Sequence, residues 1–182
     1  MIEIEIKAEV KDIEKVKDNL KKADARFIKT EEQVDRIFGH SMFLDENKFI
    51  TEGGLSARIR QVNDKKQIDF KEITRDKAGI EVSAEIGSVE DGLRFLKKLG
   101  FEEAFTLKKS RDVFQYNDFT ICLDKVDKLG NFIEIEKLVY SNSEEEKIRQ
   151  GCMELLNKLA PGSQVERRKY GDLIQELLNK DK

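Results

Sequence analysis

The chain has 182 residues, of which 39% are charged, and its 34 basic and 37 acidic side chains leave a formal net charge of −3. This length suits one domain with a substantial core. The near balance of charge argues against a general nucleic-acid binder, which would carry a basic excess.

Charges from Glu3 onward, and the lack of a long apolar run, argue against a signal peptide and a membrane span. We therefore expect one domain over residues 1–182, located in the cytoplasm and bound to neither nucleic acid nor membrane. Cys122 and Cys152 show no metal-ligand spacing, which is typical of reduced thiols. The single histidine, His40, has no partner nearby in the sequence, which argues against a catalytic triad or a zinc site.

The first nine residues alternate between apolar and charged side chains, which is the period of a β-strand. One face of this strand consists of Ile2, Ile4, Ile6 and Ala8. The other face consists of Glu3, Glu5 and Lys7. One face therefore packs on a core, while the other is wholly charged.

A helix is expected next, capped by Asp12 and ending near Lys22. Residues 26–38 look extended, and residues 41–44 could form another short strand. Three strands of the opening kind follow at 55–60, 66–74 and 80–86, and their spacing predicts an antiparallel meander.

The second half begins with a helix capped at Ser88 and ended by Gly100. Strands are then expected over 105–116, 119–126 and 132–136, and the last of these repeats the Ile/Glu alternation of the opening. Two helices close the chain, one before Pro161 and one over residues 170–178.

Charged side chains recur on one face of nearly every expected strand, opposite an apolar face. The cations are Lys7, Arg58, Arg60, Lys71, Lys109 and Arg111. The acids are Glu3, Glu5, Glu81, Glu85, Asp124, Glu134 and Glu136. An α+β fold would accommodate both faces: a closed antiparallel eight-stranded β-barrel with helices packed outside and the charges pointing into the lumen. The alternative is that these charges pair with one another on outer surfaces.

A lumen of this kind would suit a chain of phosphates bridged to metal. Arginine forks and lysine ammonium groups bind phosphate oxygens. Carboxylates beside them suit Mg²⁺ or Mn²⁺, which prefer oxygen ligands and share them with phosphates.

The same residues resemble, in order, the motifs of the CYTH superfamily, the triphosphate tunnel enzymes, which includes class IV adenylyl cyclases and thiamine triphosphatases. Glu3-x-Glu5-x-Lys7 resembles the E-x-E-x-K signature of that superfamily. Its later motifs are matched by Arg58-x-Arg60, Lys71, Glu81 to Glu85, Lys109-x-Arg111, Asp124 and Glu134-x-Glu136. The acidic strand departs from the pattern of some relatives, because Ser83 separates Glu81 from Glu85. Gln33-x-Asp35, the 88–100 helix and residues 126–136 are most similar to the class IV cyclase branch.

The resemblance implies a role for each matched position. Phosphates would be held by Lys7, Arg58, Arg60, Lys71, Lys109 and Arg111, with Glu81 and Glu85 also facing the substrate. Lys7, Lys71 and Arg111 would be catalytic, because they offset charge that develops in the transition state. One or two Mg²⁺ or Mn²⁺ ions would be held by Glu3, Glu5, Asp124, Glu134 and Glu136.

The expected function is that of a cyclase that converts ATP to cyclic AMP and pyrophosphate. The first alternative is a triphosphatase that hydrolyses tripolyphosphate, thiamine triphosphate or a nucleoside triphosphate. The second is a non-catalytic module that binds polyphosphate or nucleotide. The expected partners are thus a nucleoside triphosphate or inorganic triphosphate, with a second copy of the chain as a candidate.

Overall fold

The computed structural model describes residues 2–51, 53–73, 81–139 and 145–180, without the side chains of Ile2, Glu3 and Glu81. The first half of the chain forms β1 (Ile2–Glu9), α1 (Ile13–Lys22), β2 (Arg26–His40), the 3₁₀ turn η1 (Ser41–Phe43), β3 (Leu55–Val62), β4 (Lys65–Glu72) and β5 (Glu81–Glu85). The second half forms α2 (Val89–Lys98), β6 (Phe101–Tyr116), β7 (Phe119–Val126), β8 (Gly130–Val139), α3 (Glu145–Leu159) and α4 (Tyr170–Lys180).

The strands belong to one eight-stranded sheet in the order β1-β8-β7-β6-β2-β3-β4-β5, with antiparallel neighbours. The expected α+β fold with eight strands is therefore confirmed. Within the described part of the chain, hydrogen bonds do not join β1 to β5 at the two ends of this order. Closure of the sheet into a barrel stays a prediction.

The chain divides into two compact units. The first contains Met1–Glu31 and Lys109–Arg168, and the second contains Glu32–Lys108 and Lys169–Lys182. Strands β2 and β6 each contribute residues to both units. The expectation of one domain over the whole chain stays a prediction. No helix among the described residues is both long enough and apolar enough to cross a membrane.

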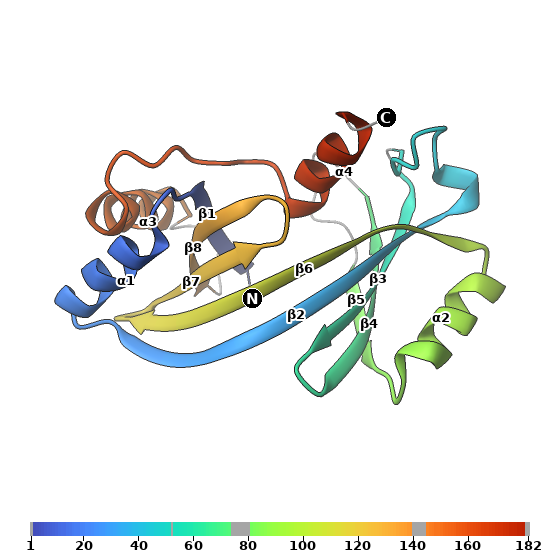
Figure 1. Ribbon diagram of the computed structural model, residues 1–182, viewed down its shortest axis with the longest axis horizontal. Helices are drawn as coiled ribbons and strands as arrows, with labels where there is room; N and C mark the ends of the chain where they lie inside the picture. Colours follow the sequence, from blue (N-terminus) through green and yellow to red (C-terminus); the bar gives the residue numbers. More distant parts are fainter. Residues whose placement is uncertain (1, 52, 74–80, 140–144, 181–182) are drawn as a thin grey trace. The chain divides into compact units, whose positions relative to one another are not determined.

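The core of the first unit lies between helices α1 and α3 and the apolar face of β1, β7 and β8 (Figure 1). Alternate residues of each strand point into it, as the period-2 pattern predicts. Its fully buried members include Ala8, Leu20, Ile121, Ile133 and Ile135. Each large side chain of this kind contributes about 1.5–3 kcal/mol through removal of apolar surface from water. The opposite face of the same strands is left for charged residues.

A smaller core stabilises the second unit, where α2 packs on β3. Ile59 and Leu96 are buried at its centre. Gly92 permits the close approach of the helix, because a Cβ at this position would lie 2.9 Å from Ile86 Cδ1 and 3.0 Å from Ile59 Cδ1.

The expected helix caps are present. The Asp12 carboxylate accepts a hydrogen bond from the Lys15 backbone N–H at 3.0 Å, and the Ser88 hydroxyl accepts one from Asp91 at 3.0 Å. Gly100, with φ of +85°, ends α2 in the left-handed conformation.

The expected strand over residues 41–44 is wrong: Ser41–Phe43 form the 3₁₀ turn η1, and only Leu44 is extended, in an isolated antiparallel bridge with Ile50. The imidazole Nδ1 of His40 accepts a hydrogen bond from the Met42 backbone N–H at 3.3 Å, and the Ser41 N–H donates to the Gly100 carbonyl at 2.9 Å. These contacts turn the chain at the end of β2. The expected strand over residues 80–86 is observed as Glu81–Glu85, and residue 80 lies outside the described residues.

The core of the first unit predicts a contrast between two positions of β8. Replacement of Ile133 by Ala should lower the free energy of unfolding by about 2–5 kcal/mol, because Ile133 is fully buried and its loss leaves a cavity. Replacement of Leu138 by Ala should change it by less than about 0.5 kcal/mol, because 58% of Leu138 is exposed. Urea unfolding measures both, and equal losses would contradict this arrangement of the core.

Candidate functional site

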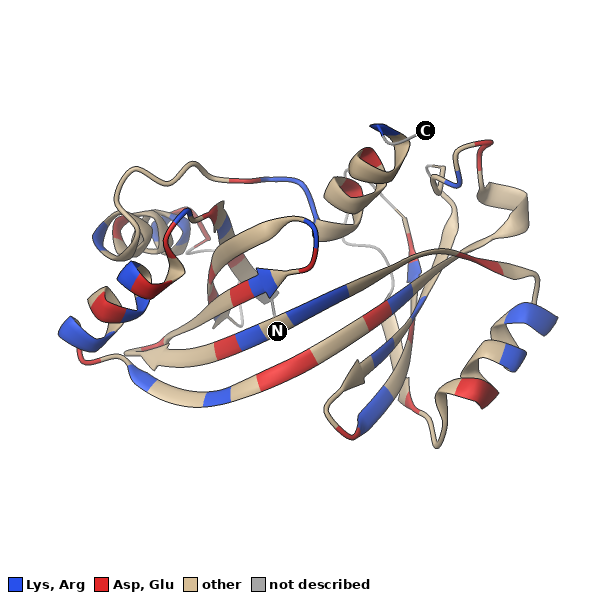
Figure 2. Ribbon diagram, in the orientation of Figure 1, with Lys and Arg blue, Asp and Glu red and all other residues tan. Residues whose placement is uncertain are grey.

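Four neighbouring strands of the first unit carry charged side chains on the face opposite the core. Charged residues of β6 are interspersed with uncharged ones in Figure 2. In the antiparallel register Lys7 of β1 lies opposite Glu134 of β8, and Arg111 of β6 lies opposite Asp124 of β7. Because opposed residues share a face of a sheet, four strands bring their charges together.

Asp124 is the most deeply buried charged residue of this face and has no exposed surface. One carboxylate oxygen accepts a hydrogen bond from Arg111 Nε at 2.7 Å, and the other accepts from Arg111 Nη2 at 2.7 Å and from Lys109 Nζ at 2.9 Å. Burial alone would raise the pKa of Asp124, but the hydrogen bonds and charges of Arg111 and Lys109 outweigh it and hold that pKa below its usual range. Asp124 is therefore a fixed anion.

Arg111 connects Asp124 to the acidic residues of β8. Its Nη2 also donates to a carboxylate oxygen of Glu134, and its Nη1 lies 3.6 Å from Glu136 Oε1. Burial opposes the charge of Arg111, but hydrogen bonds to Asp124 and the nearby carboxylates raise its pKa above the ordinary value. The guanidinium group is thus held between three carboxylates.

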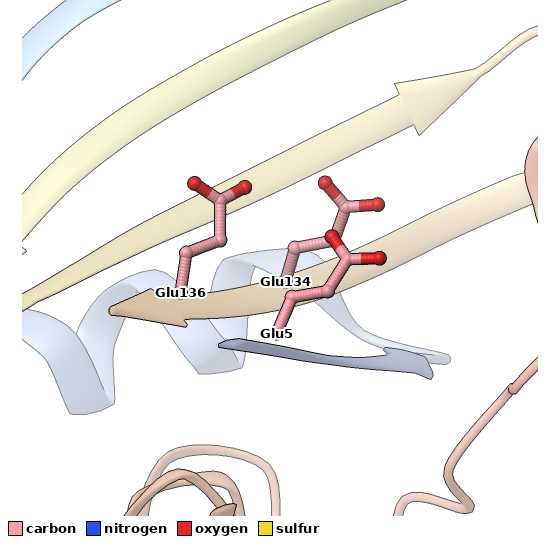
Figure 3. A group of neighbouring side chains, drawn as sticks. All are labelled: Glu5, Glu134 and Glu136. Carbon is pink, nitrogen blue, oxygen red and sulfur yellow. The ribbon is translucent and has the colours of Figure 1, made fainter. Parts of the chain in front are cut away.

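Three carboxylates of β1 and β8 form a second group, the carboxylate trio of Glu5, Glu134 and Glu136. One oxygen of each lies within 4.8 Å of the others, and Figure 3 shows the three groups on the same side of their strands. Glu5 lies directly opposite Glu136 in the register. Like charges opposed across two strands repel each other, and a cation between them would remove this repulsion. Hard oxygen donors of this kind fit Mg²⁺ or Mn²⁺.

Lys7 lies beside the carboxylate trio and is only 7% exposed. Its ammonium group donates a hydrogen bond to the backbone carbonyl of Arg168 at 2.6 Å. Burial lowers the pKa of Lys7 below its ordinary value, and the carboxylates of Glu134 and Glu5 oppose this shift without cancelling it. Glu166 lies in the same segment as Arg168, and hydrogen bonds from Arg168 lower its pKa to about 2.

The second unit has its own charged group, formed by two arginines of β3 and two aspartates. Arg58 donates from Nε to Asp69 Oδ2 at 2.7 Å. Arg60 donates from Nε and Nη2 to the two oxygens of Asp35 at 2.7 and 2.5 Å. Both aspartates are buried. Burial alone would raise the pKa of Asp69, but hydrogen bonds from Ser83 and Arg58 and the charge of Arg58 hold it below its usual range.

Four other expected site residues lie in the second unit or outside the described side chains. Lys71 is half-buried on β4, and Glu85 is exposed on β5. The backbone of Glu81 lies opposite Lys71, and that of Glu3 opposite Leu138. The side chains of Glu3 and Glu81 lie outside the described residues.

The structure thus brings some of the expected site residues together on one face of the first unit. Lys7, Lys109 and Arg111 lie together with four of the five expected metal ligands. Asp124, however, is separate from the carboxylate trio and binds Lys109 and Arg111 through both of its oxygens.

Asp35 and Asp69 are not among the site residues expected from the sequence. Two features of the sequence point to a place for them beside the charged residues. Asp69 shares the charged face of its strand with Lys71, and Asp35 stands in the Gln33-x-Asp35 segment.

Comparisons with known proteins agree with this fold. The family model described as CYTH domain matches residues 1–170. A protein of Methanocaldococcus jannaschii with the provisional name adenylate cyclase is 33% identical over 162 residues, which cover 87% of this chain and 90% of the relative. A conserved protein of Pyrococcus furiosus has a structure with a TM-score of 0.74 and 31% identity, covering 94% of this chain and 99% of its own.

A more distant structure has the same fold. It is that of a provisional adenylyl cyclase of Hippeastrum for which a dominant triphosphatase activity is reported. Its TM-score is 0.68 at 16% identity, and the match covers 96% of each chain.

The burial of Asp124 predicts a pH-dependent contribution to stability. At pH 7 Asp124→Asn should lower the free energy of unfolding by about 3–5 kcal/mol, because it leaves two buried cations without their anion. A carboxyl group with a depressed folded-state pKa contributes fully above its unfolded pKa of about 3.9 and loses that contribution as pH falls through the folded value.

The difference between wild type and Asp124→Asn should therefore shrink as the pH is lowered below about 4. Urea unfolding at a series of pH values measures it. A difference of the same size at pH 3 and pH 7 would contradict the ionised state of Asp124.

Proposed function

The chain belongs to the CYTH domain family, and from this premise we propose that it is a divalent-metal-dependent enzyme that converts ATP to cyclic AMP and pyrophosphate. The observation that carries the proposal is the meeting of Lys7, Lys109 and Arg111 with the carboxylate trio on one face of the first unit. Cations alone would suffice to bind a polyanion. Cations beside a group of carboxylates suit a polyanion that is bound together with metal.

The cations of the first unit have two tasks in this proposal. They bind phosphate oxygens before the reaction, and they stabilise the negative charge that develops on these oxygens in the transition state. Their attachment to the protein favours both tasks. Arg111 is fixed by Asp124 and Glu134, and Lys7 by the carbonyl of Arg168. Groups held in place in this way need little reorganisation during the reaction.

Glu5, Glu134 and Glu136 would hold the divalent ion, with Glu3 as a further candidate from the resemblance. The chemistry that such an ion supplies when bound is neutralisation of phosphate charge and a lower pKa for the attacking hydroxyl or water. Asp124 has a different role in this proposal, although the resemblance groups it with the metal ligands. Because both of its oxygens accept hydrogen bonds from cations, it orients Lys109 and Arg111 toward the substrate.

Arg58, Arg60 and Lys71 of the second unit are proposed as further phosphate ligands, since the resemblance gives them this role. The closed barrel with an inward-facing charged surface belongs to the same proposal. Glu81 and Glu85 remain candidates for contact with the substrate.

Cyclisation requires attack of the ribose 3′-hydroxyl on the α-phosphorus, with cleavage of its bond to the pyrophosphate oxygen. Support for this reaction comes from the 33% identical relative with the provisional name adenylate cyclase. The second candidate is hydrolysis, in which water attacks the terminal phosphorus. The triphosphatase activity reported for the Hippeastrum protein favours it. Both reactions use the same cations, so the position at which the phosphate chain is anchored selects between them.

The proposed metal site predicts a specific loss of binding. Glu136→Gln should weaken Mn²⁺ binding by at least about tenfold, because the amide keeps the shape of the side chain and loses its charge. Glu9→Gln, an exposed position of the same β1 strand that carries Glu5, is the matched control and should bind as wild type does. Electron paramagnetic resonance titration measures free Mn²⁺. Equal affinities of the two variants would contradict the site, and so would full turnover in EDTA.

The proposed reaction predicts the products. With ATP and Mg²⁺ or Mn²⁺, purified protein should release cyclic AMP and pyrophosphate, which chromatography separates from ADP and orthophosphate. Lys109→Ala and Arg111→Ala should each depress turnover by at least about tenfold, since each removes a charge-assisted contact worth about 1.5–3 kcal/mol. Orthophosphate without cyclic nucleotide, and faster turnover of tripolyphosphate than of ATP, would identify the hydrolase instead.

A further inference from the structure

Three residues of the second unit lie in a line across three neighbouring strands. Arg58 of β3 is directly opposite Asp69 of β4, and Asp69 is directly opposite Ser83 of β5. Their side chains are connected by hydrogen bonds along this line. The order is guanidinium, carboxylate, hydroxyl.

Asp69 is the centre of the line and is only 3% exposed. It accepts hydrogen bonds from Arg58 Nε at 2.7 Å, Ser83 Oγ at 2.7 Å and Gln67 Nε2 at 2.8 Å, and Arg58 Nη2 lies 2.6 Å from Oδ2. The two oxygens have separate partners. Oδ2 contacts Arg58, whereas Oδ1 accepts from Ser83 and Gln67. A carboxylate bound from both sides cannot rotate without breaking several hydrogen bonds.

The position of Asp69 fixes one edge of the Arg58 guanidinium. Nε and Nη2 point to Asp69, which directs Nη1 toward the neighbouring Asp35, where Nη1 lies 3.8 Å from Oδ2. An arginine held at one edge keeps its planar group in a single orientation, so less side-chain entropy is lost when an anion binds to its other edge.

The same geometry explains why a serine interrupts the acidic alternation of β5. A carboxylate at position 83 would lie directly opposite Asp69, and like charges opposed across strands are destabilising. The hydroxyl of Ser83 donates a hydrogen bond to Asp69 instead. The residue type at position 83 is thus matched to Asp69.

We propose that Asp69 and Ser83 are positioning residues that hold the Arg58 guanidinium in the orientation in which it binds phosphate. The claim that Arg58 binds phosphate rests on the proposed function, whereas the claim that Asp69 and Ser83 orient Arg58 does not. The groups that orient Arg58 are side chains of the protein itself, so the positioning can be tested separately from phosphate binding.

The first experiment measures Arg58 in the ligand-free protein. Side-chain ¹⁵N–¹H spectra report exchange of the Arg58 Nε–H with water, which the bond to Asp69 should slow. Ser83→Ala should accelerate this exchange at least about threefold, because Asp69 loses one of its anchors. Ser83→Thr keeps the hydroxyl and should restore the wild-type rate. Ser110→Ala, a serine of β6 in the first unit, is the control for loss of a hydroxyl from a strand. Equal rates in wild type and Ser83→Ala would overturn the positioning.

The second experiment is calorimetric titration with tripolyphosphate and Mn²⁺. Ser83→Ala should weaken binding about threefold to tenfold, and the same change in an Arg58→Ala background should have no further effect. A loss of equal size in both backgrounds would show that Ser83 does not act through Arg58 and would overturn the inference.

Asp69→Asn is a stronger variant of the same test. It should weaken binding more than Ser83→Ala does, and its thermal unfolding curve shows whether the variant is folded. Failure of wild type to bind tripolyphosphate would overturn the proposed function, whereas the exchange rates of the first experiment would still decide the positioning of Arg58.

Discussion

The pairing of a fully buried carboxylate with two cations is the interaction on which the charged face of the first unit depends. Without Lys109 and Arg111, burial of Asp124 would cost several kcal/mol. Without Asp124, the two cations would repel each other and turn toward water. Because Arg111 of β6 is fixed by Asp124 of β7, it also reaches Glu134 and Glu136 of β8, the strand beyond β7. Among Lys7, Lys109, Arg111, Asp124 and the carboxylate trio, three positive and four negative groups leave a formal charge of −1. A protein that needed only stability would replace such a network by apolar side chains.

The same strands connect this network to the core. Ile133 and Ile135 pack against the helices, while Glu134 and Glu136 point to the other face. A shift of one residue in the β1–β8 register would reverse both faces at once, so burial of the core also fixes the position of the carboxylates. The second unit uses a related arrangement, in which buried Asp35 and Asp69 each hold an arginine of β3. In both units, carboxylates orient the cations that are proposed to bind phosphate.

Much of this arrangement can be predicted from sequence because a strand has a period of two. The alternation in the first nine residues and around Glu134 predicts strands, apolar faces and charged faces. All are observed where the side chains are described, over residues 4–9 and Gly130–Val139. The pairing of charges is not available from one sequence, because it depends on the register between strands. Asp124 therefore looks like one more metal ligand until its cross-strand partner is known to be Arg111. For the same reason Asp69 and Ser83 were not predicted to act together. The turn at Ser41–Phe43 depends on a local contact of His40, which no periodicity reveals.

The central claim is that the charged face of the first unit binds a triphosphate together with a divalent ion. A crystal structure of the protein with Mn²⁺ and tripolyphosphate tests this most directly, because the anomalous scattering of manganese identifies the ion without ambiguity. We predict an anomalous peak within coordination distance of Glu5, Glu134 and Glu136, about 2.0–2.3 Å from their oxygens, and phosphate oxygens in contact with Lys7, Lys109 or Arg111. Manganese elsewhere on the molecule, or tripolyphosphate bound away from these cations, would contradict the claim.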